Sequence, residues 1–166
     1  MASVLISLGS NMGQSSDIIW QAKEQIASLE GVLELAFSSL YKTKPVGYLF
    51  QDDFINAAML IKCDLEPLEL LHRLQHIEQL HKRVRTIKNG PRTLDLDIIA
   101  ISNYTHAGST LTLPHPRMHE RAFVLIPCAQ IAPDFIVPGH NMSINSLKAK
   151  LSDEDLNSVE LLHGNK

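Results

Sequence analysis

The sequence is poor in cysteine and has no long apolar run. Cys63 and Cys128 are its only cysteines, and they stand far apart, without a C-x-x-C pair or a histidine cluster at zinc-finger spacing. We therefore expect two buried, reduced thiols. Residues 1–11 lack a positively charged region, and their apolar stretch is too short for a signal peptide or a membrane span. These absences predict a cytoplasmic protein with no membrane partner.

A basic excess is also missing. The 15 Lys and Arg residues are outnumbered by 18 Asp and Glu residues, which gives a formal net charge of -3. Proteins dedicated to nucleic acids need a net basic face, so we expect no nucleic-acid partner. The sequence contains no G-x-x-x-x-G-K-[ST] run, so nucleotide phosphates would not be cradled by a P-loop.

The length and composition are those of one folded unit. The chain has 166 residues, of which 45% are hydrophobic, enough for one core and too few for two ordinary ones. We therefore expect residues 1–166 to form a single domain and to act as a monomer. A helical or irregular segment is predicted after Pro116, and a variable tail from about residue 152.

Hydrophobic periodicity predicts the elements of this domain. Apolar residues at three- and four-residue spacing predict helices over about 15–30 and 67–82. Apolar and β-branched runs predict strands over residues 2–8, 32–41, 54–63 and 94–101. The resulting order, β-α-β-β-α-β, is that of a ferredoxin-like α+β sandwich.

Asp95 and Asp97 are the clearest candidates for metal-binding residues. They are two residues apart in a predicted strand, so both carboxylates point to one face, whereas Leu94, Leu96 and Ile98 point into the core. Two carboxylates brought together repel each other unless a cation neutralises them, and hard oxygen ligands suit Mg²⁺ held together with substrate phosphates. The alternative is a solvated sheet face that carries two acids.

A cluster of positive charge precedes this pair. Residues 82–92 contain no acidic residue and five basic ones: Lys82, Arg83, Arg85, Lys88 and Arg92. A cationic loop beside a carboxylate pair suits a polyphosphate, because guanidinium groups and metal ions can share its negative charge. A solvated loop or a nucleic-acid patch is the alternative.

The run KNGPRTLDLDII, residues 88–99, closely resembles the signature of the 6-hydroxymethyl-7,8-dihydropterin pyrophosphokinase family. The likeness continues, in the right order, at residues 9–11, 43–47, 53–58 and 113–123. Two positions depart from the family pattern: Lys88 stands where an Arg is common, and Asn89 where many members have an aromatic residue.

The resemblance implies a ferredoxin-like enzyme of folate biosynthesis. Such an enzyme transfers the pyrophosphoryl group of MgATP to the hydroxymethyl group of the pterin and releases AMP. By position, Asp95 and Asp97 would bind two Mg²⁺ ions, and Arg83 and Arg92 would meet the polyphosphate. The implied ATP contacts are Leu71, Gln75, Glu78, Arg85, Lys88, Ile98, Thr112, His115 and Arg121.

The resemblance also implies a pterin site. Phe54 and Phe123 would stack on the two faces of the flat bicycle, and Asn56 would read its edge. Thr43 and Val46 would contribute backbone groups. Apolar walls with a few matching donors and acceptors are what a buried heterocycle needs.

Without the resemblance, several of these residues have ordinary explanations. Phe54 and Phe123 would be core residues, Glu78 an exposed helix acid, and residues 9–11 a turn. Two other functions also remain open. A metal-dependent nucleotidyltransferase can combine Gly-Ser with a D-x-D strand, although here the two lie far apart in the sequence. A ferredoxin-like module could also bind a ligand without catalysis, although it would not need the acidic pair beside five cations.

Overall fold

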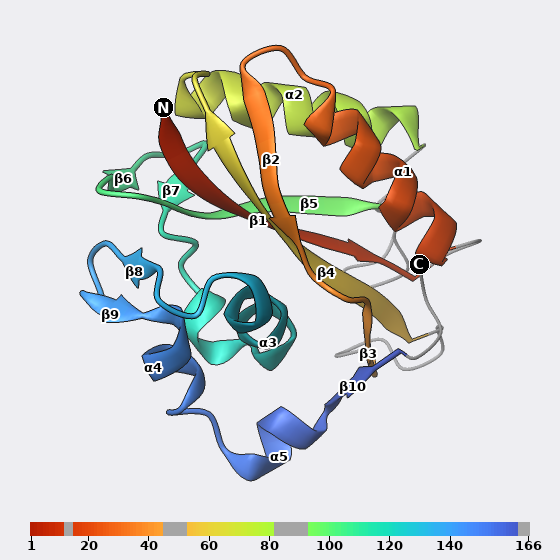
Figure 1. The fold of residues 1–166 in the computed structure, drawn as a ribbon, viewed down its shortest axis with the longest axis vertical. Helices are drawn as coiled ribbons and strands as arrows, with labels where there is room; N and C mark the ends of the chain where they lie inside the picture. The colour runs from red at the N-terminus through yellow and green to blue at the C-terminus, as the bar shows by residue number, and fades with distance from the viewer. Residues whose placement is uncertain (12–14, 45–52, 82–92, 163–166) are drawn as a thin grey trace.

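An antiparallel sheet organises the computed structural model, which describes residues 1–11, 15–44, 53–81 and 93–162 (Figure 1). Strand β1 (Ala2–Ser10) lies between β4 (Phe54–Cys63) and β5 (Asp95–Ile101). In the described chain the sheet has six strands in the order β10-β3-β4-β1-β5, with β2 also paired to β4. The other bounds are β2 (Val32–Phe37), β3 (Tyr41–Thr43) and β10 (Val159–Leu161).

Two helices cover one face of the sheet. The expected apolar stripes are buried: Ile19, Ala22 and Ile26 in α1 (Ser15–Ala27), and Leu70, Leu74 and Ile77 in α2 (Pro67–Leu80). They share one core with the side chains of β1 and β4 that point to this face, including Ile6, Leu8, Met59 and Ile61. Pro67 begins α2, where its missing N–H costs no hydrogen bond.

The opposite face is covered by α3 (Ala122–Ile131) and α4 (Ile144–Lys148) (Figure 1). A second core forms there from Leu5, Ala58, Ile99 and the buried residues of α3 and α4. The β8–β9 hairpin (Ile136–Val137 and Met142–Ser143) and the 3₁₀-helix η1 (Met118–Glu120) also contribute to this second core. The β6–β7 hairpin (His106–Ala107 and Thr112–Leu113) instead contributes Leu113 to the first core. The predicted mixed α+β class with an antiparallel sheet is thus confirmed.

Both cysteines are free and buried, as expected. Full burial in α3 raises the pKa of the Cys128 thiol to about 12, and burial also raises the pKa of Cys63. Thiols held in the protonated form react slowly. In the described residues, none of the helices has both the length and the apolar character that crossing a bilayer requires.

The strand predicted over residues 32–41 is two strands, β2 and β3, with a break at residues 38–40. Ser38 causes the break locally. Its N–H donates to the Ala58 carbonyl at 2.9 Å, while its hydroxyl, in place of a backbone carbonyl, accepts from the Ala58 N–H at 2.8 Å. Hydroxyl side chains compete with sheet ladders in this way, and the pattern of apolar residues does not reveal it.

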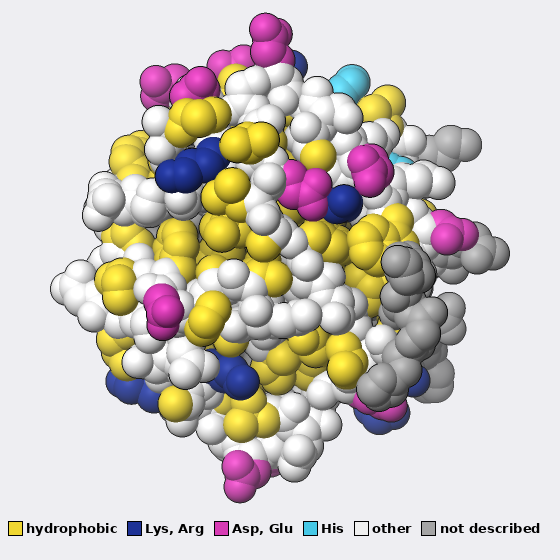
Figure 2. Space-filling view, viewed as in Figure 1, with side chains coloured by type: hydrophobic (Ala, Val, Ile, Leu, Met, Phe, Trp, Pro, Cys, Tyr) yellow, Lys and Arg dark blue, Asp and Glu magenta, His cyan; other side chains and the backbone are white. Residues whose placement is uncertain are grey.

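Strand β2 lies at an edge of the sheet, and part of its surface is apolar. Leu33 and Leu35 are exposed, and Figure 2 shows apolar side chains across the centre of the face where β2 and α3 lie in Figure 1. The inner side of β2 instead contacts α1. Lys23 of α1 forms an ion pair with Glu34 at 3.2 Å, and Trp20 packs against Phe37 with ring centroids 5.1 Å apart.

Leu74 tests the core on the α1 and α2 side. Its side chain is fully buried, so Leu74→Ala should lower the free energy of unfolding by about 2–5 kcal/mol through lost burial and a cavity. Leu68→Ala, on the exposed side of the same helix, should change it by less than about 0.5 kcal/mol. Urea unfolding of both variants measures the difference, and equal losses would contradict the assigned core.

Candidate active site

Strand β1 joins the two halves of the site. Gly9 is paired with Asn56 of β4 on one side and with Asp95 of β5 on the other. Ser7, two residues earlier, is paired with Asp97 of β5. All five residues line one cavity. Gly9 is therefore part of a strand and of the site, and the expectation that residues 9–11 form only a turn is wrong.

Asp95 and Asp97 lie on one face of β5, as their spacing predicted. Both are partly exposed and both line the cavity, whereas Leu94, Leu96 and Ile98 are buried in the core. Because the Ile98 side chain packs inside, only its backbone can face a ligand. The alternation of β5 thus directs two carboxylates to the cavity and the intervening apolar side chains to the core.

Glu78 is buried, with 8% of its surface exposed. Its Oε2 accepts a hydrogen bond of 2.7 Å from the backbone N–H of Leu96, the residue between the two aspartates. The alternative that Glu78 is an exposed helix acid is therefore wrong. Its carboxylate links α2 to the acidic strand, and a buried carboxylate left without such a partner would be costly.

The polar edge of the cavity is formed by Asn56 and Thr43. Asn56 is buried in β4, and its Nδ2 donates to the Thr43 hydroxyl on β3. A Cβ atom added to Gly9 would lie 3.1 Å from Asn56 Oδ1, so the absence of a side chain at residue 9 leaves room for the amide. Phe54, two residues before Asn56, also lines the cavity.

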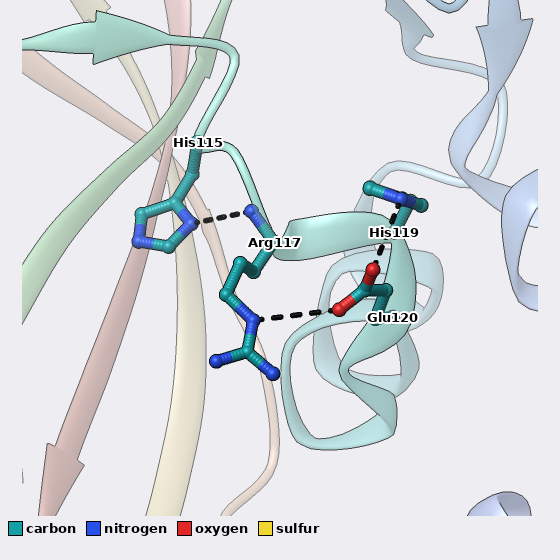
Figure 3. A network of polar contacts seen from close by, with 4 residues as sticks. All are labelled: His115, Arg117, His119 and Glu120. Carbon is teal, nitrogen blue, oxygen red and sulfur yellow. Dashed lines mark hydrogen bonds and ion pairs between the residues drawn. The ribbon is translucent and has the colours of Figure 1, made fainter.

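The opposite wall comes from the start of α3 and from η1. Phe123 lines the cavity, and the Arg121 guanidinium lies over its ring at 5.6 Å. Arg117 and Glu120 line it too, and their side chains form an ion pair with Nε and Oε1 3.4 Å apart (Figure 3). Glu120 also approaches His119, with Oε2 and Nε2 3.6 Å apart. This wall carries an aromatic ring beside two guanidinium groups.

Gln130 connects that wall to β3. Helix α3 carries Phe123 at its start and Gln130 near its end. The Gln130 Oε1 accepts from the Tyr41 hydroxyl at 2.7 Å and from the Ser39 N–H at 3.0 Å, and its Nε2 donates to the Ser39 hydroxyl at 3.0 Å. Helix and strand are thus held at a set spacing beside the cavity.

His115 lies near the acidic pair. Its Nδ1 accepts from the backbone N–H of Arg117 at 3.2 Å (Figure 3), which leaves the proton of a neutral ring on Nε2. Burial, followed by the charge of Arg121, lowers the pKa of His115 below its ordinary 6.5, although Asp95 acts in the opposite direction. His115 is therefore expected to be neutral at physiological pH.

The cavity has a volume of about 520 Å³, within the range of small-molecule sites. It brings together Asp95, Asp97, Arg121, Thr43, Phe54, Asn56 and Phe123 from the predicted set. The remaining lining residues had not been predicted as contacts, and they are Ser7, Gly9, Lys44, Arg117, Glu120, Ala122, Asp155 and Ser158. The runs of family likeness at 9–11, 43–47 and 113–123 are the signal that could have indicated five of them: Gly9, Lys44, Arg117, Glu120 and Ala122.

Several predicted contacts are not tested by this cavity. Leu71, Gln75, Glu78, Ile98, Thr112 and His115 do not line it. Val46, Arg83, Arg85, Lys88 and Arg92 lie outside the described residues. The contribution of these residues stays a prediction from the family resemblance.

The donor set of the acidic pair suits a hard divalent cation. Asp95 and Asp97 offer carboxylate oxygens, and among the described residues no group of three or more His, Cys, Asp or Glu side chains could enclose a metal ion. Water or substrate oxygens could complete the coordination of a cation at this pair. That is the usual arrangement for Mg²⁺ with a nucleotide.

The lowered pKa of His115 predicts a pH dependence of stability. As the pH falls below 6.5, the unfolded chain binds a proton at His115 before the folded chain does, so the free energy of unfolding should decrease until the native pKa is passed. Urea unfolding from pH 8 to pH 5 should show a smaller decrease for His115→Gln than for the wild type. Equal decreases would contradict the neutral, buried ring.

Comparisons with known proteins identify the family of this chain. Residues 5–133 match the family model of 7,8-dihydro-6-hydroxymethylpterin-pyrophosphokinase. The chain is 38% identical over 156 residues to 2-amino-4-hydroxy-6-hydroxymethyldihydropteridine pyrophosphokinase of Haemophilus influenzae, covering 94% of this chain and 97% of that protein. To the Bacillus subtilis protein of the same name it is 44% identical over 126 residues, covering 76% and 75%.

A solved structure has a similar fold. Wild-type HPPK-DHPS of Plasmodium falciparum, solved with pteroate, superposes with a TM-score of 0.69 at 14% identity, over 90% of this chain and 42% of that one. At this identity the likeness concerns the fold alone. The family model and the two bacterial relatives go further, and by them the chain belongs to the 7,8-dihydro-6-hydroxymethylpterin-pyrophosphokinase family.

Proposed function

We propose that the cavity beside Gly9 is where this pyrophosphokinase transfers the pyrophosphoryl group of ATP to the hydroxymethyl group of 6-hydroxymethyl-7,8-dihydropterin. Pyrophosphoryl transfer in folate biosynthesis is the activity of the family to which the chain belongs. One observation carries the assignment to this cavity: β1 pairs with Asn56 on one side and with Asp95 on the other. A heterocycle at Asn56 and a phosphate chain at the aspartates would thus be neighbours.

The pterin would occupy the side formed by β3, β4 and α3. Phe54 and Phe123 supply apolar surface, and the Asn56 amide supplies the polar group that meets the rim of the bicycle. Thr43 already accepts one hydrogen of that amide, so the amide has a defined orientation before the substrate arrives. Specificity would reside in this edge, because an unmatched buried amide is costly.

The phosphates of ATP would occupy the side formed by β5, η1 and the start of α3. Arg117 and Arg121 supply positive charge from one wall. The family resemblance assigns His115 to the phosphates as well, and a neutral ring that accepts at Nδ1 can donate a hydrogen bond from Nε2. Asp95 and Asp97 would hold two Mg²⁺ ions, whose role when bound is to neutralise the phosphate oxygens and align the reacting groups. The assignment of Arg83 and Arg92 to the polyphosphate rests on the family resemblance.

In the proposed reaction the hydroxymethyl oxygen attacks the β-phosphorus. The new oxygen–phosphorus bond forms as the bond between the β-phosphorus and the oxygen bridging it to the α-phosphate breaks, and the products are the pterin diphosphate and AMP. The hydroxymethyl proton is released, and we assign no side chain as its acceptor. The described residues would act by positioning the two substrates and by balancing charge, which is how phosphoryl-transfer enzymes generally work.

Three further features belong to the proposal. The core would be ferredoxin-like, which is supported by the strand order β3-β4-β1-β5 and by α1 and α2 on one face. Residues 1–166 would form a single domain and act as a monomer. The place of action would be the cytoplasm.

The nucleotide product tests the function directly. Incubation of the purified protein with MgATP and 6-hydroxymethyl-7,8-dihydropterin should release AMP in step with the loss of the pterin alcohol, measured by chromatography. Release of ADP would indicate transfer of a single phosphoryl group. Release of pyrophosphate would indicate the alternative nucleotidyltransferase. Either result would overturn the proposal.

In the same assay, Asp95→Asn and Asp97→Asn should each reduce kcat by about 100-fold or more, because charge stabilisation in the transition state would be lost. Asp134→Asn is the matched control, since Asp134 is exposed and lies outside the cavity. It should retain full activity. Circular dichroism should show that all three variants are folded. Near-normal kcat values of Asp95→Asn and Asp97→Asn would contradict the metal assignment.

Gly9→Ala should weaken pterin binding by about tenfold, because the new Cβ would meet Asn56 Oδ1 and such overpacking costs about 1–3 kcal/mol. Calorimetric titration with the pterin measures the effect. In an Asn56→Ala background the same substitution should cost much less, since the amide that it displaces is gone. Equal losses in both backgrounds would show that Gly9 does not act through Asn56.

A further inference from the structure

The last described segment of the chain returns to the cavity. α5 (Asp153–Asn157) brings Asp155 to the cavity wall, and Ser158 follows it. This segment lies beyond residue 133, where the match to the family model ends. Part of the cavity wall therefore comes from outside the region by which the family model identifies the chain.

The strand after α5 forms the outer edge of the sheet. β10 is antiparallel to β3, with Val159 opposite Thr43 and Glu160 opposite Lys42. Lys42 Nζ and Glu160 Oε1 are 3.9 Å apart across this pair. The Leu162 N–H donates to the Leu40 carbonyl at 3.0 Å. Leu162 and Leu40 are thus a hydrogen-bonded pair. Along an antiparallel ladder such pairs alternate with pairs that are not hydrogen-bonded, so Glu160 and Lys42, two residues further along, are also a hydrogen-bonded pair.

The segment is anchored at both ends. At its start the Ser152 hydroxyl caps α5 by accepting from the Asp155 N–H at 3.1 Å, and the Ser158 hydroxyl donates to the Asp155 carbonyl at 2.6 Å. At its end Leu162 packs against the core that lies under α1 and α2. Between these anchors, α5 and β10 both contact α3, the helix that carries Phe123. The segment thus touches two walls of the cavity.

Strand β3 has only three residues, and Thr43 is one of them. Its hydroxyl accepts from the Asn56 amide, so the place of β3 determines which end of that amide faces the cavity. A short strand at a sheet edge frays easily, because few hydrogen bonds hold it. β10 supplies a second ladder along the outer side of β3, opposite β4.

We propose that β10 is a positioning element for the pterin: it holds β3 in place and thereby sets the orientation of the Asn56 amide through Thr43. This inference rests on the proposed function of the cavity. It assigns to residues 159–162 an effect on the pterin and none on ATP, because the acidic pair lies on β5, on the far side of β1 from β3.

Glu160→Pro tests the proposal, because proline removes the N–H that bonds β3. Glu160→Ala is the matched control, since it keeps that N–H and removes only the exposed ion pair. We expect the Kd of the pterin to rise about tenfold in Glu160→Pro, the equivalent of about one lost hydrogen bond. In Glu160→Ala it should change less than about twofold. The Kd of an unreactive ATP analogue with Mg²⁺ should stay within about twofold in both variants.

A second pair of variants tests the same link with less risk to folding. Glu160→Lys places two lysines opposite each other across the ladder, which is unfavourable. It should raise the Kd of the pterin about two- to threefold, and adding Lys42→Glu should restore the wild-type value.

Three outcomes would overturn the inference. One is unchanged pterin affinity in a folded Glu160→Pro protein, and another is an equal loss of pterin and ATP-analogue affinity, which would indicate general destabilisation. If Glu160→Pro does not fold, unchanged pterin affinity in Glu160→Lys decides against it. The wild type serves as the separate test of function: if it forms no AMP from ATP and the pterin, the proposed function fails, whatever the variants do.

Discussion

The register of β1 between β4 and β5 is the constraint on which the site depends. Gly9 faces Asn56 on one neighbour and Asp95 on the other, so a single strand sets the distance between the polar edge and the acidic pair. A slip of β1 by one residue would put Leu8 or Ser10 in the place of Gly9 and would turn the apolar side chains of β1 to the opposite face. The core prevents such a slip, because Leu8 and Leu96 are buried in it.

Around this register, the two faces of the sheet have different roles. The face under α1 and α2 is apolar and supplies the main core. The other face carries a smaller core under α3 and leaves the cavity beside it. Helices reach the site through single polar side chains: Glu78 bonds the strand between the aspartates, and Gln130 bonds β3. Each side chain fixes a backbone segment that carries a residue of the proposed site.

The local sequence pattern was sufficient to predict a strand or the facing of a side chain where the residues have a single physical explanation. The strand Phe54–Cys63 begins and ends as predicted, and the alternation at Asp95 and Asp97 indicated which face they occupy. The alternative that Glu78 is an exposed helix acid was wrong, because its spacing on α2 says nothing about the backbone N–H that it meets on β5. The strand over residues 32–41 was misjudged because Ser38 bonds a distant residue, Ala58.

The sequence by itself determined the chemistry and the family. The acidic pair, its preceding cations and the run at 88–99 are local in the chain. Their residue types indicate a polyphosphate, and the family resemblance of the run implies the pterin, both without any coordinates. Only the tertiary structure decided what surrounds them. Gly9, Arg117 and the segment ending in β10 reach the cavity through strand pairing and packing between residues far apart in the chain, and such contacts depend on the whole fold.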